Sequence, residues 1–190
     1  ILRSLPALTV VAPGDLWEVA EATEAIINQP GTCYLRLDKS YASPSHKKDE
    51  RFHLGKARII CEGQDLTFLV TGGVLAEVLE AKDRLLDDGI CARVLSVHTI
   101  KPLDTEAIVS ASRETGGIIT VEEHTIHGGL GGAVAETILE SGIYPKFFYR
   151  IGIRAAGFAS VVGSQQFLRK TYALDSASIY TKALELLRFC

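Results

Sequence analysis

The sequence predicts an α/β protein with a mostly parallel five-stranded sheet covered by helices on both faces, preceded by the strand-helix-strand end of another α/β domain. Two observations predict this fold. From residue 57 onward, apolar strand-like runs alternate with amphipathic helical segments, the pattern of a parallel sheet between helices. Residues 1–38 hold one further crossover, which has too little apolar surface to fold alone because parallel strands need cover on both faces.

The first unit contains two predicted strands and one predicted helix. Residues 8–12 are apolar and predict a short strand, after which Pro13-Gly14-Asp15 turns the chain. Asp15 and Glu18 have the spacing of a capping box, so we expect a helix from there to about residue 28. A second strand is predicted over residues 33–37.

Residues 39–56 differ abruptly in composition from both flanking segments. They are rich in Ser, Pro, Lys, Asp, Glu and His and show no apolar periodicity. This composition is typical of a solvated linker and marks a domain boundary. We therefore predict a remnant domain over 1–38, a linker over 39–56 and a second domain over 57–190.

The second unit is predicted in chain order from its apolar patterns. Segments 57–61 and 66–71 flank a Gly-Gln-Asp turn, so we expect them to form a hairpin that supplies an antiparallel edge to the sheet. Strand-like runs and helix-like stripes then alternate to the end of the chain. The further strands are predicted at 91–97, 117–122 and 147–151, and the helices at about 72–88, 104–114, 130–141 and 176–187.

Charge and composition exclude several classes of function. With 20 basic and 23 acidic side chains, the formal net charge of -3 creates no field that would attract nucleic acid or an anionic membrane. No apolar run reaches the roughly 18 residues of a membrane span. We expect a cytoplasmic protein, and because the sequence begins at Ile1 and lacks methionine, we expect it to be a piece of a larger one.

The four cysteines indicate neither a zinc site nor a disulfide framework. Cys33, Cys61, Cys91 and Cys190 are widely scattered and lack CxxC spacing. We interpret them as buried or terminal thiols in a reducing compartment. No Ser-His-Asp or Cys-His pattern surrounds Ser160, Ser164 or Cys190, so the sequence offers no self-contained nucleophile.

Four glycines at 128, 129, 131 and 132 follow a predicted strand and open a predicted helix. Such a loop can bind a dinucleotide at the amino end of the helix. The spacing does not match G-x-G-x-x-G, and no acidic residue ends the next strand where a ribose contact would need one. Close packing of the helix against its neighbours is the favoured interpretation.

Acidic and histidine side chains precede these glycines. Glu122, Glu123, His124 and His127 suggest a metal or acid-base cluster, but consecutive residues of a strand point to opposite faces, so Glu122 and Glu123 cannot both reach one ion. We expect no metal ligands here and a loop at a domain or subunit surface. His98 follows a strand and is interpreted as a hydrogen-bonded histidine at the sheet edge, with contact to a substrate as the alternative.

Arg36 ends the apolar strand CYLRL, where a guanidinium is costly unless an anion meets it. Asp38 is the simplest partner within the chain. The alternative partner is the phosphate of a substrate. The residues alone leave these two possibilities open.

Three strings resemble one enzyme family. VVAPGD (10–15), RVLSVHTIKPLD (93–104) and TVEEHTIHGGLGGAVAE (120–136) are similar to the carboxyl-terminal third of transketolase, and most similar to the small subunits of split bacterial transketolases. The resemblance implies the end of the pyrimidine-binding domain followed by the C-terminal domain. It also implies a fragment of a transferase that moves a two-carbon ketol unit between sugar phosphates in the pentose phosphate pathway.

The resemblance also carries implications for cofactors, partners and sites. The complete enzyme would use thiamine diphosphate and Mg²⁺, whereas this fragment would bind neither, would hold no catalytic residue and would be inactive alone. Its partners would be the remaining domains or a large subunit, in a homodimer or heterotetramer, where it would form dimer contacts and part of the substrate entrance. Arg36 occupies the position of a family arginine that contacts the sugar phosphate.

One segment departs from the family pattern. Residues 153–158 and the longer stretch 160–164 replace the sequence that relatives carry after the last strand. The departure leaves two other branches open, because deoxyxylulose-5-phosphate synthases and the beta subunits of 2-oxoacid dehydrogenases share the architecture. A stand-alone Rossmann-like binding or regulatory module is the alternative from another class of function.

Overall fold

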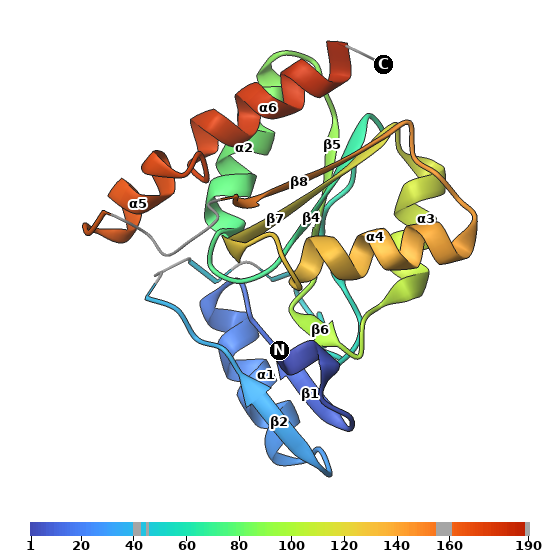
Figure 1. The fold of residues 1–190 in the computed structure, drawn as a ribbon, viewed down its shortest axis with the longest axis vertical. Helices are drawn as coiled ribbons and strands as arrows, with labels where there is room; N and C mark the ends of the chain where they lie inside the picture. Colours follow the sequence, from blue (N-terminus) through green and yellow to red (C-terminus); the bar gives the residue numbers. More distant parts are fainter. Residues whose placement is uncertain (40–42, 45, 155–160, 189–190) are drawn as a thin grey trace.

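The computed structural model describes residues 1–39, 43–44, 46–154 and 161–188. Two sheets lie end to end, and helices cover the larger one on both faces (Figure 1). The strands are β1 (Leu8–Val11), β2 (Thr32–Leu35), β3 (Arg58–Cys61), β4 (Leu66–Val70), β5 (Ala92–Ser96), β6 (Thr99–Lys101), β7 (Gly117–Thr125) and β8 (Phe147–Ile153). The helices are η1 (Leu2–Ser4), α1 (Leu16–Ile27), α2 (Leu75–Asp87), α3 (Thr105–Glu114), α4 (Leu130–Ser141), α5 (Gln165–Thr171) and α6 (Ser176–Arg188).

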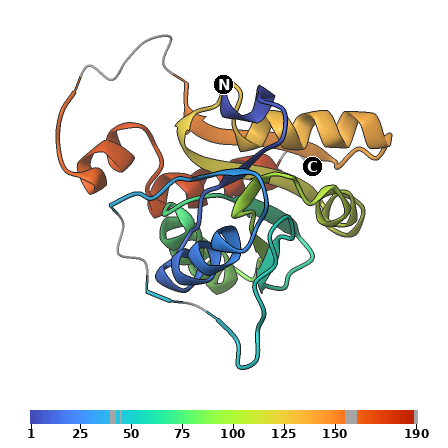
Figure 2. The same cartoon turned by 90° about the horizontal axis from the view of Figure 1, so that it is seen from below.

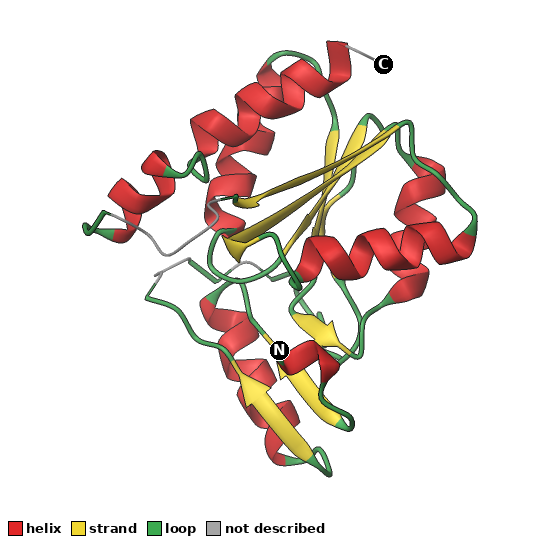
Figure 3. Ribbon diagram, in the orientation of Figure 1, coloured by secondary structure: helices red, strands yellow, loops and turns green. Residues whose placement is uncertain are grey.

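The larger sheet confirms the predicted fold class. Its strand order is β3-β5-β4-β7-β8, and every neighbouring pair is parallel except β3 with β5. Helices α2 and α6 pack on one face, and α3 and α4 pack on the other, which Figures 2 and 3 show as layers on either side of the sheet. The central strand β4 is buried along its whole length, as a strand covered on both faces must be.

The predicted hairpin is wrong. Segment β3 does form the antiparallel edge of the sheet, but it pairs with β5, and β5 separates it from β4. The turn between β3 and β4 packs against the start of β5 instead: the amides of Gln64 and Asp65 both donate to the Cys91 carbonyl at 3.0 and 3.1 Å. A Cβ on Gly63 would lie 2.4 Å from the backbone of Ala92, so this crossing needs glycine.

A smaller sheet joins the two units. Its order is β2-β1-β6, with β1 parallel to β2 and antiparallel to β6. Strand β6 belongs to the second unit in sequence, and its end is held by Lys101, whose Nζ donates to the carbonyl of Arg3 at 3.0 Å and to that of Leu5. The predicted division at residues 39–56 remains a prediction, but the two flanking units share a sheet.

Other features match or extend the sequence analysis. Asp15 caps α1 by accepting from the amide of Glu18 at 2.8 Å, as predicted. Cys33, Cys61 and Cys91 are free thiols, but none of them is buried as expected: Cys33 and Cys61 are half-buried and Cys91 is exposed. Cys190 and Ser160 lie outside the described residues. Within the described part of the chain, every helix is too short or too polar to cross a membrane.

Candidate functional site

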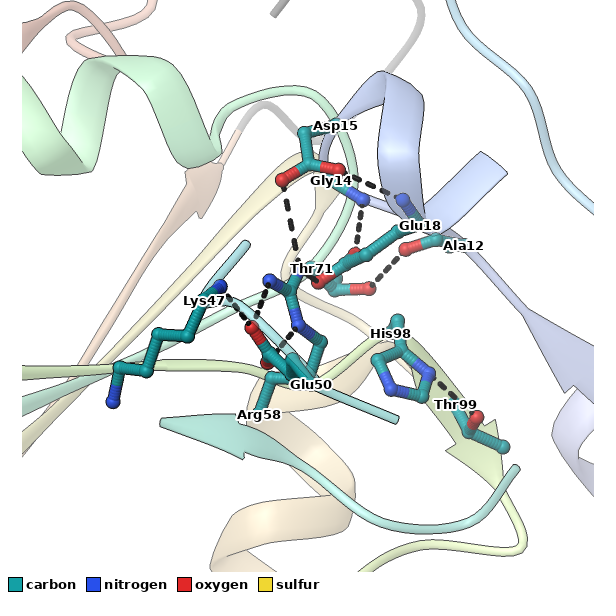
Figure 4. A network of polar contacts seen from close by, with 10 residues as sticks. All are labelled: Ala12, Gly14, Asp15, Glu18, Lys47, Glu50, Arg58, Thr71, His98 and Thr99. Carbon is teal, nitrogen blue, oxygen red and sulfur yellow. Dashed lines mark hydrogen bonds and ion pairs between the residues drawn. The ribbon is translucent and has the colours of Figure 1, made fainter. Parts of the chain in front are cut away.

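A buried cluster of charges lies where the two units meet (Figure 4). Arg58, at the start of β3, places its Nη1 2.5 Å from Glu18 Oε1 and 3.5 Å from Asp15 Oδ2. Its Nε donates to Glu50 Oε1 at 2.8 Å, and its guanidinium lies 4.3 Å from the centre of the Trp17 ring. One side chain of the second unit therefore holds both the start of α1 and the predicted linker.

Two acids of this cluster, Glu18 and Glu50, have shifted pKa values. Burial raises the pKa of Glu18, and the hydrogen bonds that its carboxylate accepts from Gly14 and Arg58 only partly offset that rise. Burial acts on the pKa of Glu50 in the same direction, but the hydrogen bond and charge of Arg58 bring it below its usual value. Because Arg58 contacts both acids, the arrangement acts as an internal clamp.

His98 lies beside this clamp and is fully buried. Its Nδ1 is 2.9 Å from Thr99 Oγ1, its ring stacks on Phe52 with 4.2 Å between centres, and its Nε2 has no partner among the described residues. Burial and the nearby charge of Arg58 lower the pKa of His98 to about 3. The imidazole is therefore neutral at physiological pH and packs inside the protein, not at an exposed sheet edge.

The carboxyl ends of β4 and β7 form the crevice where an open α/β sheet normally binds its ligand, because α2 and α4 leave these neighbouring strands in opposite directions. Here the end of the first unit covers part of that crevice. Ala12 accepts hydrogen bonds from the Gly72 amide at 3.1 Å and from Thr71 Oγ1 at 3.3 Å. Asp38 accepts one from the Gly73 amide at 2.9 Å, just ahead of α2.

An internal carboxylate also occupies the amino end of α4. Glu122 is fully buried and accepts hydrogen bonds from the amides of Leu130 at 2.7 Å and Gly131 at 3.1 Å. A Cβ on Gly129 would lie 1.9 Å from Glu122 Oε2, and one on Gly131 would lie 2.7 Å from the Arg150 side chain. The glycines thus permit close packing, as expected, and the end of the helix is already neutralised by a charge of the protein itself.

Glu123 points away from Glu122, as the alternation of a strand requires. Its Oε1 accepts hydrogen bonds from Arg169 Nε and Gln165 Nε2, both at 2.9 Å. Arg169 is buried and also contacts Glu77 at 3.3 Å. Glu123 therefore fastens α5 to the larger sheet, and the two glutamates do not converge on a common site.

Arg36 directly follows β2 and is half-buried. It lines a groove of about 420 Å³ between the two units, together with His124 and His127 of the β7–α4 loop. No carboxylate among the described residues forms an ion pair with Arg36, and Asp38, its expected partner, binds the Gly73 amide. The contact of Arg36 with a substrate phosphate stays a prediction.

Other chemistry is weakly represented in the described ranges. No group of three or more His, Cys, Asp or Glu side chains there could hold a metal ion. Ser164 caps α5 by accepting from the amide of Phe167 at 3.2 Å. The Arg58 cluster was not predicted from the sequence. The signal was present, because Arg58 lies in the apolar run ARII as Arg36 lies in CYLRL.

This architecture defines a class: an α/β domain whose ligand crevice is partly covered by the end of a neighbouring α/β unit, with a groove left between the two. Residues 55–179 match the family model described as the transketolase C-terminal domain. The chain therefore belongs to the transketolase family and carries its C-terminal domain.

Similar proteins agree with this assignment. The chain is 36% identical over 185 residues to "6-deoxy-6-sulfo-D-fructose transketolase subunit SqwH" of Clostridium sp. (strain MSTE9), covering 97% of this chain and 56% of the relative. It is 33% identical over 180 residues to 1-deoxy-D-xylulose-5-phosphate synthase 1 of Geobacter sulfurreducens, covering 94% of this chain and 28% of that protein.

A solved structure titled "Split gene transketolase, inactive beta4 tetramer" superposes with a TM-score of 0.89 at 32% identity, over 98% of this chain and 60% of that one. The chain thus spans little more than half the length of this structure and of the transketolase subunit.

Proposed function

We propose that the chain is the carboxyl-terminal part of a thiamine-diphosphate-dependent transketolase, which transfers a two-carbon ketol unit between sugar phosphates. The observation that carries this proposal is the match of residues 55–179 to the transketolase C-terminal domain, joined to a preceding unit that also aligns with split transketolases. The part present here would shape the substrate entrance and contact other subunits. The complete enzyme would be cytoplasmic and serve the pentose phosphate pathway.

Among the described residues, the amino ends of α2, α3 and α4 do not fit thiamine diphosphate. A diphosphate would need free amides at a helix amino end, but Glu122 takes those of α4, Asp38 lies at the start of α2 and Asp104 caps α3. We therefore place cofactor and metal in other parts of the complete enzyme.

The surface around β2 is open to binding by those other parts. Strand β2 is the open edge of the smaller sheet, and apolar side chains around it are exposed. They are Leu16, Ile27, Tyr34 and Leu37. We propose that the remaining transketolase domains, or a large subunit, cover this surface in a homodimer or heterotetramer.

Within this proposal, Arg36 binds the phosphate of the sugar substrate. Its support is the groove position and the lack of a carboxylate partner among the residues described. In the complete enzyme, Arg36→Ala should raise the KM for phosphorylated sugars about 10- to 100-fold, since a charge-assisted contact contributes about 1.5 to 3 kcal/mol.

Steady-state kinetics with matched phosphorylated and unphosphorylated sugars test this role. Arg113→Ala, which removes the same charge from α3, is the control and should change neither KM. Equal effects of Arg36→Ala on both sugars would remove Arg36 from the phosphate site.

Cofactor binding provides the test of the whole proposal. Calorimetric titration of the 190 residues with thiamine diphosphate and magnesium should give no binding, whereas the complete enzyme should bind both and transfer ketol units. Tight binding by the 190 residues alone would contradict the assignment of the cofactor site to other parts.

A second candidate is a fragment of a deoxyxylulose-5-phosphate synthase or of a 2-oxoacid dehydrogenase beta subunit. The similarity to the Geobacter synthase favours the first of these two. Product analysis separates the branches, because a 2-oxoacid donor releases carbon dioxide and a ketose phosphate donor does not.

A stand-alone Rossmann-like module is disfavoured because Glu122 takes the amides at the amino end of α4, where a nucleotide phosphate would bind. A nucleotide titration should therefore give no heat. Tight nucleotide binding would support the alternative of a stand-alone Rossmann-like module.

A further inference from the structure

A second cavity lies between the edge strand β8 and helix α6. Its volume is about 340 Å³, which is in the range of pockets for small metabolites. Tyr149 of β8 and Ser178 and Lys182 of α6 form part of its wall, together with Tyr172 from the α5–α6 turn and Arg154 just after β8. All of these residues lie outside the groove that contains Arg36.

Two cations converge on one ring in this cavity. The Arg154 guanidinium lies 4.8 Å and the Lys182 ammonium 5.4 Å from the centre of the Tyr149 ring. Each cation is attracted electrostatically to the negative face of the ring. Their like charges repel one another, however, so the arrangement favours an anion placed between them.

The nearby acids do not neutralise the cavity itself. None of the described residues that line it is acidic. Asp175 accepts a hydrogen bond from Ser178 at 2.6 Å, and the exposed Glu185 pairs with Lys182 along the surface of α6. An exposed pair of that kind contributes little and can give way to a ligand with more charge.

Arg150 is also part of the wall, but its guanidinium donates to the Ile126 carbonyl at 3.1 Å. Arg154 donates from one nitrogen to the Arg150 carbonyl at 2.6 Å, which fixes its position beside the ring and leaves its other nitrogens available. Tyr149 and Tyr172 also line the cavity, and a tyrosine hydroxyl is a neutral donor.

We propose that this cavity binds a small phosphate-bearing metabolite, with Arg154 and Lys182 contacting the phosphate oxygens and the tyrosine hydroxyls contacting the rest of the ligand. The site is separate from the groove that contains Arg36, and it does not depend on which reaction the complete enzyme catalyses.

The test is calorimetric titration of the complete protein with two probes, orthophosphate and pyrophosphate. Saturating thiamine diphosphate and magnesium, together with an Arg36→Ala background, remove phosphate binding at the proposed cofactor and substrate sites. Arg154→Gln and Lys182→Ala should each weaken binding about ten-fold or more, whereas Lys182→Arg should retain it. Lys170→Ala, which removes an exposed cation of α5 outside the cavity, is the matched control and should bind as the background protein does.

The outcomes are distinct. Preference for pyrophosphate over orthophosphate would assign the site to diphosphate ligands, and the reverse would assign it to phosphate monoesters. Circular dichroism and ketol transfer should be the same in all cavity variants, which separates loss of the ligand from loss of the fold. Absence of binding, or binding that Arg154→Gln and Lys182→Ala reduce no more than Lys170→Ala does, would overturn the proposal.

Discussion

Arg58 shows how much of the structure can depend on a single side chain. Its guanidinium contacts Glu18 and Asp15 of the first unit and Glu50 of the segment between the units, while its exposed fraction is only 6%. Removing one member of a buried ion pair leaves an uncompensated charge, which costs about 3 to 5 kcal/mol. We therefore expect Arg58→Ala to lower the free energy of unfolding by about that amount.

Urea unfolding of the wild type and the variant measures this effect. Arg51→Ala, which removes an exposed arginine from the same segment, should change the free energy of unfolding by less than about 0.5 kcal/mol. Similar losses in the two variants would mean that the buried cluster contributes no specific stability.

His98 predicts a pH dependence of stability. Its pKa is about 3 in the folded protein, because of burial and the charge of Arg58, against an ordinary value of 6.5. Between these two values the unfolded chain binds more protons at this position, so acidification favours unfolding. The contribution of His98 to stability is complete above about pH 6.5 and declines as the pH falls towards 3, by up to about 1.4 kcal/mol per pH unit.

Comparison with His98→Phe isolates this contribution, because phenylalanine retains a ring against Phe52 but does not titrate. Urea midpoints at about pH 7 and about pH 5 should differ less in the variant than in the wild type. If the two proteins lose the same free energy on acidification, the buried imidazole is not responsible.

For single residues, the sequence indicates that a buried arginine needs an anionic partner, but it does not identify that partner. A guanidinium in an apolar strand requires an anion, and that rule applies to Arg36 and Arg58 alike. The partner of Arg58, Glu18, lies forty residues earlier and already had a predicted role as a helix cap. Only the folded chain shows that this glutamate is buried at the junction, where its carboxylate binds the Gly14 amide and Arg58.

Among the elements, α4 depends most clearly on one side chain. The Glu122 carboxylate accepts hydrogen bonds from two amides in its first turn. Glu122→Ala would leave both amides buried without a partner, so we expect a loss of about 2 to 4 kcal/mol in the free energy of unfolding. Thermal or urea denaturation measures the loss, and Glu140→Ala, at an exposed position of the same helix, is the matched control.

Hydrogen exchange adds a local measurement. The amides of Leu130 and Gly131 should exchange faster in Glu122→Ala, while those of α6 should keep their protection. Unchanged exchange at α4 would show that water replaces the carboxylate without loss.

The elements themselves were largely predictable from periodicity. Long segments such as α2, α4 and β7 appear close to their expected bounds, because their apolar residues repeat over several turns or along a whole strand. Pairing was less predictable. Strand β6 has only three residues and pairs with β1 about ninety residues earlier in the chain. The predicted hairpin does not form, and the turn between β3 and β4 donates hydrogen bonds to the Cys91 carbonyl instead.

For the whole molecule, we expect the two units to unfold together. They share the smaller sheet, the buried charges around Arg58 and the hydrogen bonds that Ala12 accepts from Thr71 and Gly72 just after β4. Trp17 is the only tryptophan in the chain and reports on the first unit, whereas far-UV circular dichroism reports mainly on the second. The two signals should follow one transition in urea, and two separated midpoints would contradict a shared core.

The position of β6 also bears on how genes for such enzymes can be divided. A break in the coding sequence between residues 38 and 57 would place β1 and β6 on different polypeptides, and each product would be made with an open strand edge that invites aggregation. A break upstream of β1 leaves that pairing within one product. A division between the two units would therefore expose strand edges that a division upstream of β1 leaves paired. We expect functional split genes of this family to encode both units on one polypeptide.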